Sequence, residues 1–259
     1  MTKRFRSLMF VVLSQILLLL SSCHISRGIN GVDGQPGTDG ISQTKRVKGD
    51  GNIVLQNRNI TESFDKFEVN KGIELILTQS ENKSVSVETD ENLQAVITTT
   101  VENGTLMVTS NAPFNANKGV IVRVSLSQIS GLKSSSGSSV KSTNTLKTKS
   151  LIVDSSSGSN VAIDVDAEFI SLESSSGSTI KMGGKAVKLE TTSSSGSSIL
   201  AGKLIANEVL SQTSSGSTTV VHPVESLIAK ASSGSQVKYY NIPKNLEKKE
   251  SSGGSISKE

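Results

Sequence analysis

Acidic side chains in the C-terminal half of the chain are the residues with the clearest potential for chemistry. Hydrolysis of a glycosidic bond needs two carboxylates that face each other across a cleft. Asp164 and Asp166 are two residues apart and would share one face of a strand. Asp154 and Glu173 each stand four residues before a glycine of a repeated Ser-Gly-Ser motif, so they would stack in a repeating fold. The six candidates are Asp154, Asp164, Asp166, Glu168, Glu173 and Glu190.

A solvated acidic face is the favoured interpretation of these residues. Stacked carboxylates repel each other, so such a pair would either bind a cation or stay in water. Lyases similar to pectate lyase combine Ca²⁺ with a basic catalytic residue, whereas residues 134–259 contain lysines but no arginine. The sequence therefore predicts a protein that is not an enzyme, and a carbohydrate-active enzyme is the least favoured alternative.

Other catalytic and metal-binding patterns are missing from the sequence. His24 and His222 are the only histidines and Cys23 is the only cysteine, which is too few ligands for a zinc site. A Ser-His-Asp triad would rest on His222 alone. The glycine-rich stretches lack the Lys-Ser/Thr pair of a phosphate-binding loop. We expect no metal and no cofactor.

Residues 1–22 have the features of a secretory signal peptide. Lys3, Arg4 and Arg6 precede an apolar run, Leu8 to Leu20, that is shorter than the about 20 apolar residues of a membrane span. Two serines and then Cys23 follow, which resembles the lipobox of bacterial lipoproteins, where the cysteine is acylated and becomes the first mature residue. An ordinary signal with an incidental cysteine is the alternative. Because Cys23 has no disulfide partner, we predict that it is lipidated and anchors the chain to a membrane.

The mature chain offers little to a nucleic acid. Without the three basic residues of the signal peptide, 24 basic and 23 acidic residues remain, a net charge of +1. Aromatic residues make up 3% of the chain, so base stacking has few partners. Recognition of nucleic acid needs a clustered basic face, and we expect no such partner.

Residues 23–47 have the composition of a tether. Glycine recurs at every third position from Gly28 to Gly40, which is the period of collagen. Four triplets with one proline are too few for a stable triple helix, so a flexible tether is favoured over a short trimerising stalk. The oligomeric state stays open.

Residues 48–242 are predicted to form one all-β domain. Apolar and polar residues alternate in several short runs, as they do in half-buried strands, and Asn103-Gly104 indicates a hairpin turn between two of them. Residues 49–126 are either extra solenoid coils or a separate β cap, and one continuous domain is favoured. The expected strands are Phe67–Val69, Ile73–Leu77, Val85–Thr89, Ala95–Val101, Leu106–Thr109 and Val120–Leu126.

From residue 134 onward, a Ser-Gly-Ser motif returns at intervals of 18 to 21 residues. A fixed period near 20 residues is typical of stacked supersecondary units. Apolar residues stand in register, three residues after and seven residues before most of the glycines, as a stacked core requires. Disordered Gly/Ser linkers would not carry such phased residues. The repeated glycines are Gly137, Gly158, Gly177, Gly196, Gly216, Gly234 and Gly253.

The period predicts a β-solenoid with coils of about 19–20 residues, each holding three short strands and three turns. Glycine would adopt a left-handed conformation at a tight corner without a Cβ clash. The serines would stack in ladders whose hydroxyls bond to the coils above and below. A structural role for these ladders is favoured over display of a hydroxyl surface to a ligand. Residues 243–259, with a degenerate last repeat, are expected to be a partly frayed Lys/Ser-rich tail.

The chain resembles the DUF2807 family, described as a putative auto-transporter adhesin head (GIN) domain and common in Bacteroidetes. The resemblance covers about residues 48–242 and rests on Gly49–Asn52, Phe67–Ile73, Val87–Leu93 and the repeated Ser-Ser-Gly-Ser corners. It implies a right-handed parallel β-helix-like solenoid with an adhesin-like role, and it defines no catalytic residues.

These observations together predict a non-catalytic lipoprotein of the cell envelope, placed at the outer membrane, with its periplasmic or surface orientation left open. Its partners would be the membrane, through the lipid, and a glycan or protein surface as ligand. A structural or stress-related component of the periplasm is the alternative.

Overall fold

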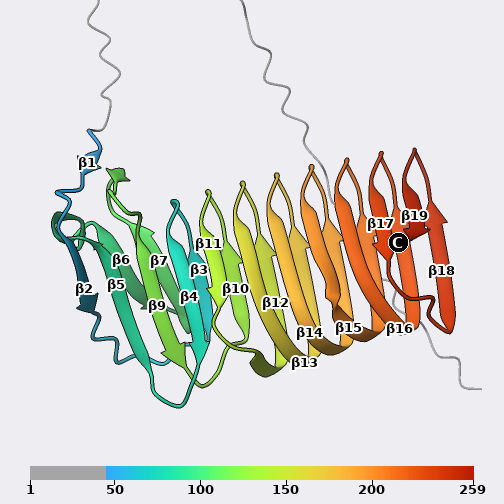
Figure 1. Cartoon of the computed structure of the whole chain (residues 1–259), viewed down its shortest axis with the longest axis horizontal. Coiled ribbons are helices and arrows are strands. Elements are labelled where there is room, and N and C mark those ends of the chain that lie inside the picture. Colours follow the sequence, from blue (N-terminus) through green and yellow to red (C-terminus); the bar gives the residue numbers. More distant parts are fainter. Residues whose placement is uncertain (1–44) are drawn as a thin grey trace, which may run out of the picture. The chain divides into compact units, whose positions relative to one another are not determined.

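Residues 45–259 are described by the computed structural model, and they form one coiled β structure (Figure 1). Seventeen strands belong to a single sheet, which confirms the all-β solenoid. The signal peptide, Cys23 and most of the tether lie outside the described residues. Within residues 45–259 the only helical element is a 3₁₀ turn, Glu91–Leu93, and no helix is long and apolar enough to cross a bilayer.

The strands fall into an N-terminal group of mixed direction and a C-terminal group of parallel coils. The first group consists of β1 (Val47–Lys48), β2 (Ile53–Asn57), β3 (Lys66–Val69), β4 (Glu74–Gln79), β5 (Ser84–Asp90), β6 (Ile97–Glu102), β7 (Thr105–Ser110), β8 (Phe114–Asn115) and β9 (Ile121–Leu126). The second consists of β10 (Gly131–Ser134), β11 (Ser139–Ser142), β12 (Leu146–Ser155), β13 (Asn160–Ser174), β14 (Thr179–Ser193), β15 (Ser198–Thr213), β16 (Thr218–Ala231), β17 (Gln236–Tyr239), β18 (Asn245–Glu250) and β19 (Ser255–Lys258).

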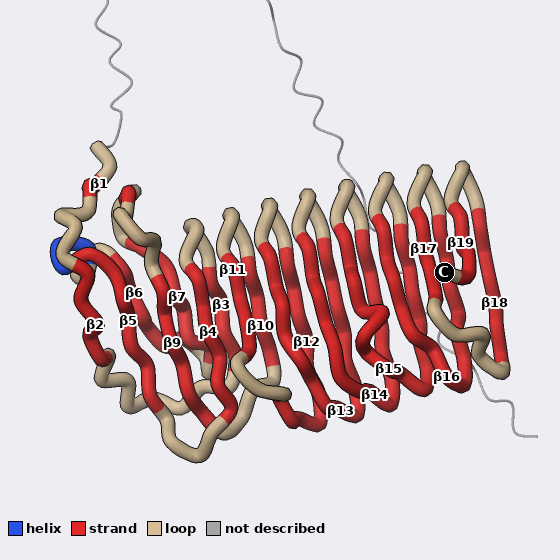
Figure 2. Tube along the Cα trace, viewed as in Figure 1, coloured by secondary structure: helices blue, strands red, loops and turns tan. Residues whose placement is uncertain are grey.

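Each central coil is one long, bent strand closed by one tight turn, and the prediction of three short strands and three turns was wrong. β13, β14 and β15 contain 15, 15 and 16 residues. The inward-outward alternation of β13 slips once, at Glu168 and Phe169, where the chain bends; the pairing with β14 skips Glu168 and resumes in the same register. Figure 2 shows the tight turns in a row along one edge and the bent strands along the other.

The tight turns have the geometry of type I′ turns. The repeated glycines have φ between 67° and 75°, which confirms the predicted left-handed corner. The serine before each glycine is also left-handed, with φ between 47° and 54°, and this was not predicted. Two successive positive φ values are characteristic of this turn type. Each turn also bonds to the next one, as when the Gly158 amide donates to the Ser176 carbonyl at 3.1 Å.

The serine that follows each of the first six repeated glycines is buried and bonds to the neighbouring coil. The Ser178 hydroxyl donates to the Ser155 carbonyl of the preceding coil at 2.7 Å, and its oxygen lies 2.8 Å from that of Ser174. Ser159, Ser197, Ser217 and Ser235 make the same bond to a preceding carbonyl. The ladders are therefore structural. Most of their bonds between coils go to the main chain, and the predicted bonds between hydroxyls of adjacent coils also occur, as when Ser193 donates to Ser217 at 3.2 Å.

The N-terminal half both continues the solenoid and closes it. β3 and β4 pair in parallel with β10 and β11, and their connecting turn at Lys71 and Gly72 has the same left-handed geometry as the Ser-Gly turns. β7 and β9 extend the parallel stack. β2, β5 and β6 then add antiparallel strands that cap it. The predicted strands and the Asn103-Gly104 hairpin are confirmed, and coils and cap form one continuous unit.

The last residues form an ordered final coil, and the expected frayed tail was wrong. β18 pairs in parallel with β16, and β19 pairs with β17. Ile256 is 4% exposed because it takes the inward position that Val237 holds one coil earlier. A degenerate motif suffices here because Gly253 still adopts the left-handed turn.

Asp90 holds the cap together and joins two sequence motifs that lie far apart in the chain. Its buried carboxylate accepts hydrogen bonds from the main-chain amides of Gly51 (2.8 Å) and Asn117 (2.9 Å) and from the Asn117 side chain. A Cβ at Gly49 would lie 2.3 Å from the Asp90 Cγ, so only glycine fits there. Burial raises the pKa of Asp90, but the hydrogen bonds from Asn117 and Gly51 outweigh it and leave the pKa below its ordinary value of 3.8.

The stability that Asp90 contributes should depend on pH. Because its pKa is lower in the folded state, this contribution is complete above about pH 4 and is lost as the pH falls through the folded-state pKa. Asp90→Asn should lower the melting temperature by the same amount from pH 5 to pH 8, and the difference from the wild type should shrink below pH 3.8. Melting curves of both proteins from pH 2.5 to pH 8 test this, and a constant difference across the range would contradict it.

Candidate functional site

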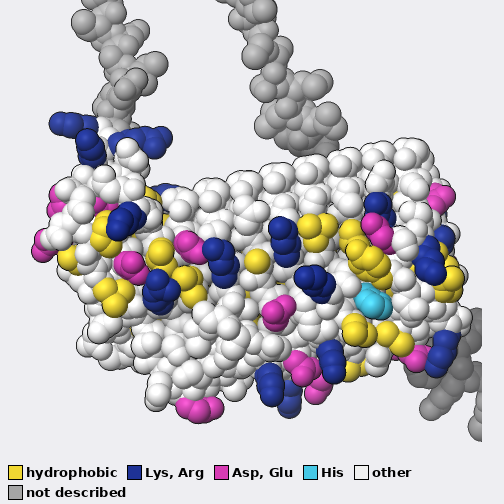
Figure 3. All heavy atoms as spheres, viewed as in Figure 1, with side chains coloured by type: hydrophobic (Ala, Val, Ile, Leu, Met, Phe, Trp, Pro, Cys, Tyr) yellow, Lys and Arg dark blue, Asp and Glu magenta, His cyan; other side chains and the backbone are white. Residues whose placement is uncertain are grey.

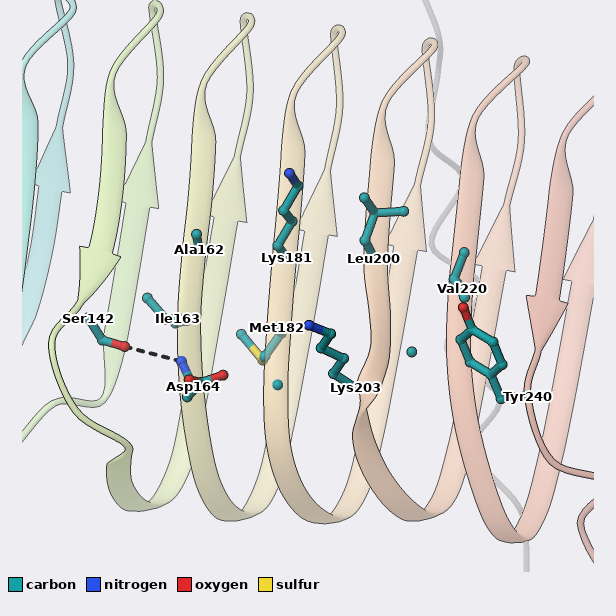
Figure 4. A pocket seen from close by; sticks show the side chains of 12 residues that line it. Ser142, Ala162, Ile163, Asp164, Lys181, Met182, Leu200, Lys203, Val220 and Tyr240 are labelled. Atoms are coloured by element: carbon teal, nitrogen blue, oxygen red, sulfur yellow. Dashed lines mark hydrogen bonds between the residues drawn. The ribbon is translucent and has the colours of Figure 1, made fainter. Parts of the chain in front are cut away.

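A groove of about 480 Å³ runs along one face of the solenoid, across successive coils. It begins at Ser142 of β11, crosses β13, β14, β15 and β16, and ends at Tyr240, just after β17 (Figure 4). Figure 3 shows apolar side chains gathered near His222 on this face, with lysines around them. The groove is therefore open to solvent along its length and combines apolar with charged groups.

Two glycines in neighbouring strands create the hollow. Gly183 stacks between Asp164 of β13 and Lys203 of β15, so the row has no side chain at its centre. β15 bulges at Ala201 and Gly202, because Lys181 and Gly183 pair with Leu200 and Lys203. This irregularity shifts the outward residues of β15 relative to the coils on either side.

Tyr240 lies directly against the bulge and forms one end wall of the groove. A Cβ at Gly202 would come within 2.3 Å of the Tyr240 Cε2 atom, so the ring packs on bare backbone. His222 lies beside it, with ring centroids 6.2 Å apart, and the His222 Nδ1 is 3.3 Å from the Gly202 carbonyl oxygen. The Tyr240 side chain nevertheless stays 48% exposed. An aromatic face held in place yet open to water is a surface on which a ligand can stack.

Polar groups stand at the other positions of the groove. The Asp164 amide donates to the Ser142 hydroxyl at 3.1 Å, which positions both residues at the β11 end (Figure 4). The Asp164, Lys181 and Lys203 side chains point outward and are exposed. Among the ion pairs of residues 45–259, none includes any of these three. Their charges are available to a ligand.

The six acidic candidates lie at several different places on the solenoid. Asp154 and Glu173 stack in adjacent strands as predicted, but on the strands that lead into the tight turns and outside the groove. Glu190 pairs with Lys188 at 2.7 Å and raises the pKa of that lysine. Asp166 and Glu168 are exposed side chains of β13. Asp164 alone lines the groove, so that site lacks the second carboxylate that glycoside hydrolysis needs.

Metal binding has no support within the described part of the chain, where no three acidic, histidine or cysteine side chains cluster. The repeated glycines all have the left-handed backbone of the tight turns, and Cys23 lies outside the described residues.

Sequence reasoning missed the groove and its principal residues. Tyr240, Lys203 and Gly202 belong to no repeated motif, so the repeat pattern did not identify them as site residues. One signal was present: the spacing from Gly196 to Gly216 is one residue longer than the two spacings before it, which is the extra residue of the bulge.

Comparisons with known proteins identify a family and a shared fold. A family model described as "Putative auto-transporter adhesin, head GIN domain" matches residues 63–243. No curated protein matches the sequence.

Solved structures share the fold at low sequence identity. A "putative adhesin" from Bacteroides fragilis superposes with a TM-score of 0.78 at 19% identity, covering 82% of this chain and all of that one. A "putative adhesin" from Parabacteroides merdae gives a TM-score of 0.68 at 17% identity, covering 83% of this chain and 99% of the other. A "putative lipid binding protein" from Parabacteroides distasonis gives 0.68 at 19% identity, covering 83% of this chain and 100% of the other.

Proposed function

Because the chain belongs to the DUF2807 family of putative auto-transporter adhesin head (GIN) domains, we propose that it is an adhesin-like, non-catalytic lipoprotein of the cell envelope. In this proposal Cys23 carries the lipid, residues 24–47 form the tether, and the solenoid presents its groove to a ligand. The ligand is a glycan or a protein surface, and the anchored chain resides at the outer membrane.

The open groove with Tyr240 at its end is the observation that carries this proposal. Its floor is held by the ladders between β13, β14 and β15, and β16 pairs with β15 on either side of the bulge, so the shape of the groove exists before a ligand arrives. Binding to a rigid, preformed surface avoids the entropic cost of ordering a loop. The groove has an exposed aromatic ring and unpaired charges, and these groups suit recognition rather than catalysis.

Replacing Tyr240 with alanine is expected to weaken ligand binding about ten-fold, because tyrosine is one of the residue types that most often contribute a large share of binding energy. The full chain, purified in detergent, would be screened against a panel of purified bacterial and host polysaccharides and matrix proteins. Affinities for each ligand found would then be measured with both proteins.

Ile242→Ala is the matched control for this experiment. Ile242 is 61% exposed in the same connection but does not line the groove, so its variant should bind like the wild type. Unchanged affinity of the Tyr240 variant for every ligand found would refute the groove as the binding site.

Replacing Cys23 with serine is expected to abolish membrane attachment. Acyl chains on the cysteine hold the protein on the bilayer, and serine cannot receive them at that position. Wild-type protein should sediment with outer membranes and take up labelled fatty acid, whereas the variant should do neither. A double variant, Cys23→Ser with Ser26→Cys, should also fail, because the thiol must stand at the cleavage site. Attachment of the Cys23→Ser variant would show that another segment anchors the chain.

A further inference from the structure

The charges left in the groove specify the kind of ligand that it accepts. Lys181 and Lys203 contribute two positive charges and Asp164 contributes one negative charge. Two other lysines on the same face are in ion pairs: Lys141 pairs with Glu74 at 2.8 Å and Lys238 with Glu259 at 3.3 Å. Lys181 and Lys203 belong to no ion pair of the described residues, so both charges in the groove can attract an acidic ligand.

The order of groups along the groove suits an extended chain. Figure 4 shows Asp164, Lys203 and Tyr240 following one another along the solenoid axis, with Lys203 reaching over the floor toward Met182. Ser142 on β11 and Gly202 on β15, against which the Tyr240 ring packs, are three strand spacings apart, roughly 14 Å at ~4.8 Å per spacing. A single sugar ring is too short to contact both Ser142 and Tyr240, whereas a linear oligomer can.

A peptide strand has no docking position on this floor. Peptides commonly add to a sheet by bonding to an open edge. The groove lies on the face of the sheet and not at an open edge; β13 pairs with β14 throughout this region, and β15 pairs with β16 on both sides of the bulge, at Leu200 and Ile205. Recognition therefore depends on side chains, and it favours a ligand that presents hydroxyl and carboxylate groups around apolar ring faces.

From these observations we infer that the groove binds a linear acidic polysaccharide whose sugars carry carboxylate groups. Lys181 and Lys203 pair with the carboxylates, Asp164 and Ser142 bond to hydroxyls, and a sugar ring stacks on Tyr240. This inference rests on the proposed function and specifies its ligand class.

The test uses the full chain in detergent and three hexameric probes. These are oligogalacturonate, which is acidic; a neutral galactose hexasaccharide; and hexaglutamate, an acidic peptide. Oligogalacturonate should bind best, and its affinity should fall as salt is added. Lys181→Ala combined with Lys203→Ala should lower this affinity about ten-fold or more, because each lost bond involves a charged group.

Two further variants separate the inference from the proposal beneath it. Lys230→Ala combined with Lys249→Ala removes the same charge outside the groove and should bind like the wild type. Tyr240→Ala should weaken binding of both hexasaccharides. Suppose that the neutral hexasaccharide instead binds as tightly as oligogalacturonate, with an affinity that the double lysine variant leaves unchanged and that Tyr240→Ala lowers. That result would refute the acidic ligand class but would still support the groove as the binding site. Tighter binding of hexaglutamate than of oligogalacturonate would refute a glycan as the ligand. If Tyr240→Ala changed the affinity for none of the probes, the groove would not be the binding site.

Discussion

Gly184→Ala should destabilise the solenoid by about 3–5 kcal/mol, because backbone strain and a main-chain clash act together. Gly184 has φ of 111°, a conformation that side-chain-bearing residues rarely adopt. A Cβ at this position would lie 2.0 Å from the Val165 carbonyl oxygen and 2.9 Å from its carbon. Both atoms belong to the neighbouring strand, so neither can move without disrupting the ladder between β13 and β14. Urea denaturation followed by circular dichroism would measure the loss.

Gly177→Ala separates the cost of the left-handed backbone from the cost of the clash with Val165. Gly177 also has a positive φ, 70°, but no atom lies within 4 Å of the position a Cβ would take. Its replacement should cost about 1–2 kcal/mol, the penalty of a left-handed alanine alone. If both variants shifted the denaturation midpoint equally, the contact with Val165 would not be the source of the larger effect.

The contrast between these glycines shows which parts of the fold a sequence can reveal. Gly177 belongs to a motif that returns every coil, so its left-handed turn could be predicted from recurrence and the absence of a Cβ. Gly184 stands in the middle of a strand and occurs once. Its role depends on the approach of the Val165 carbonyl, and no local pattern encodes that distance.

The contacts of the cap and the position of the groove could not be predicted from the sequence for a related reason. The Gly49–Asn52 and Val87–Leu93 motifs could be recognised as family features. The sequence does not show, however, that the Asp90 carboxylate accepts a hydrogen bond from the Gly51 amide. Tyr240 meets Gly202 only because coils of unequal length bring the two residues together. Regular repeats predict the scaffold well. The candidate site arises where the repeat is broken, and it required the structure.

Leu189→Ala should destabilise the protein by about 2–5 kcal/mol, the usual cost of a cavity at a fully buried leucine. Leu189 is 0% exposed and stacks between Ile170 and Val209 of the adjacent coils. Neither neighbour can fill the space, because each is fixed in register by its own backbone pairing. The free energy of unfolding from urea titration would report the loss.

Leu246→Ala provides a control within the same column of side chains. Leu246 pairs with Leu227 but belongs to the last coil, and it is 39% exposed. Its replacement should cost about 1 kcal/mol or less, since much of the side chain is already in water. In a solenoid each coil is stabilised mainly by its two neighbours, so the same substitution should cost less at an end than in the middle. Equal losses at both positions would mean that burial by adjacent coils does not determine the stability of this fold.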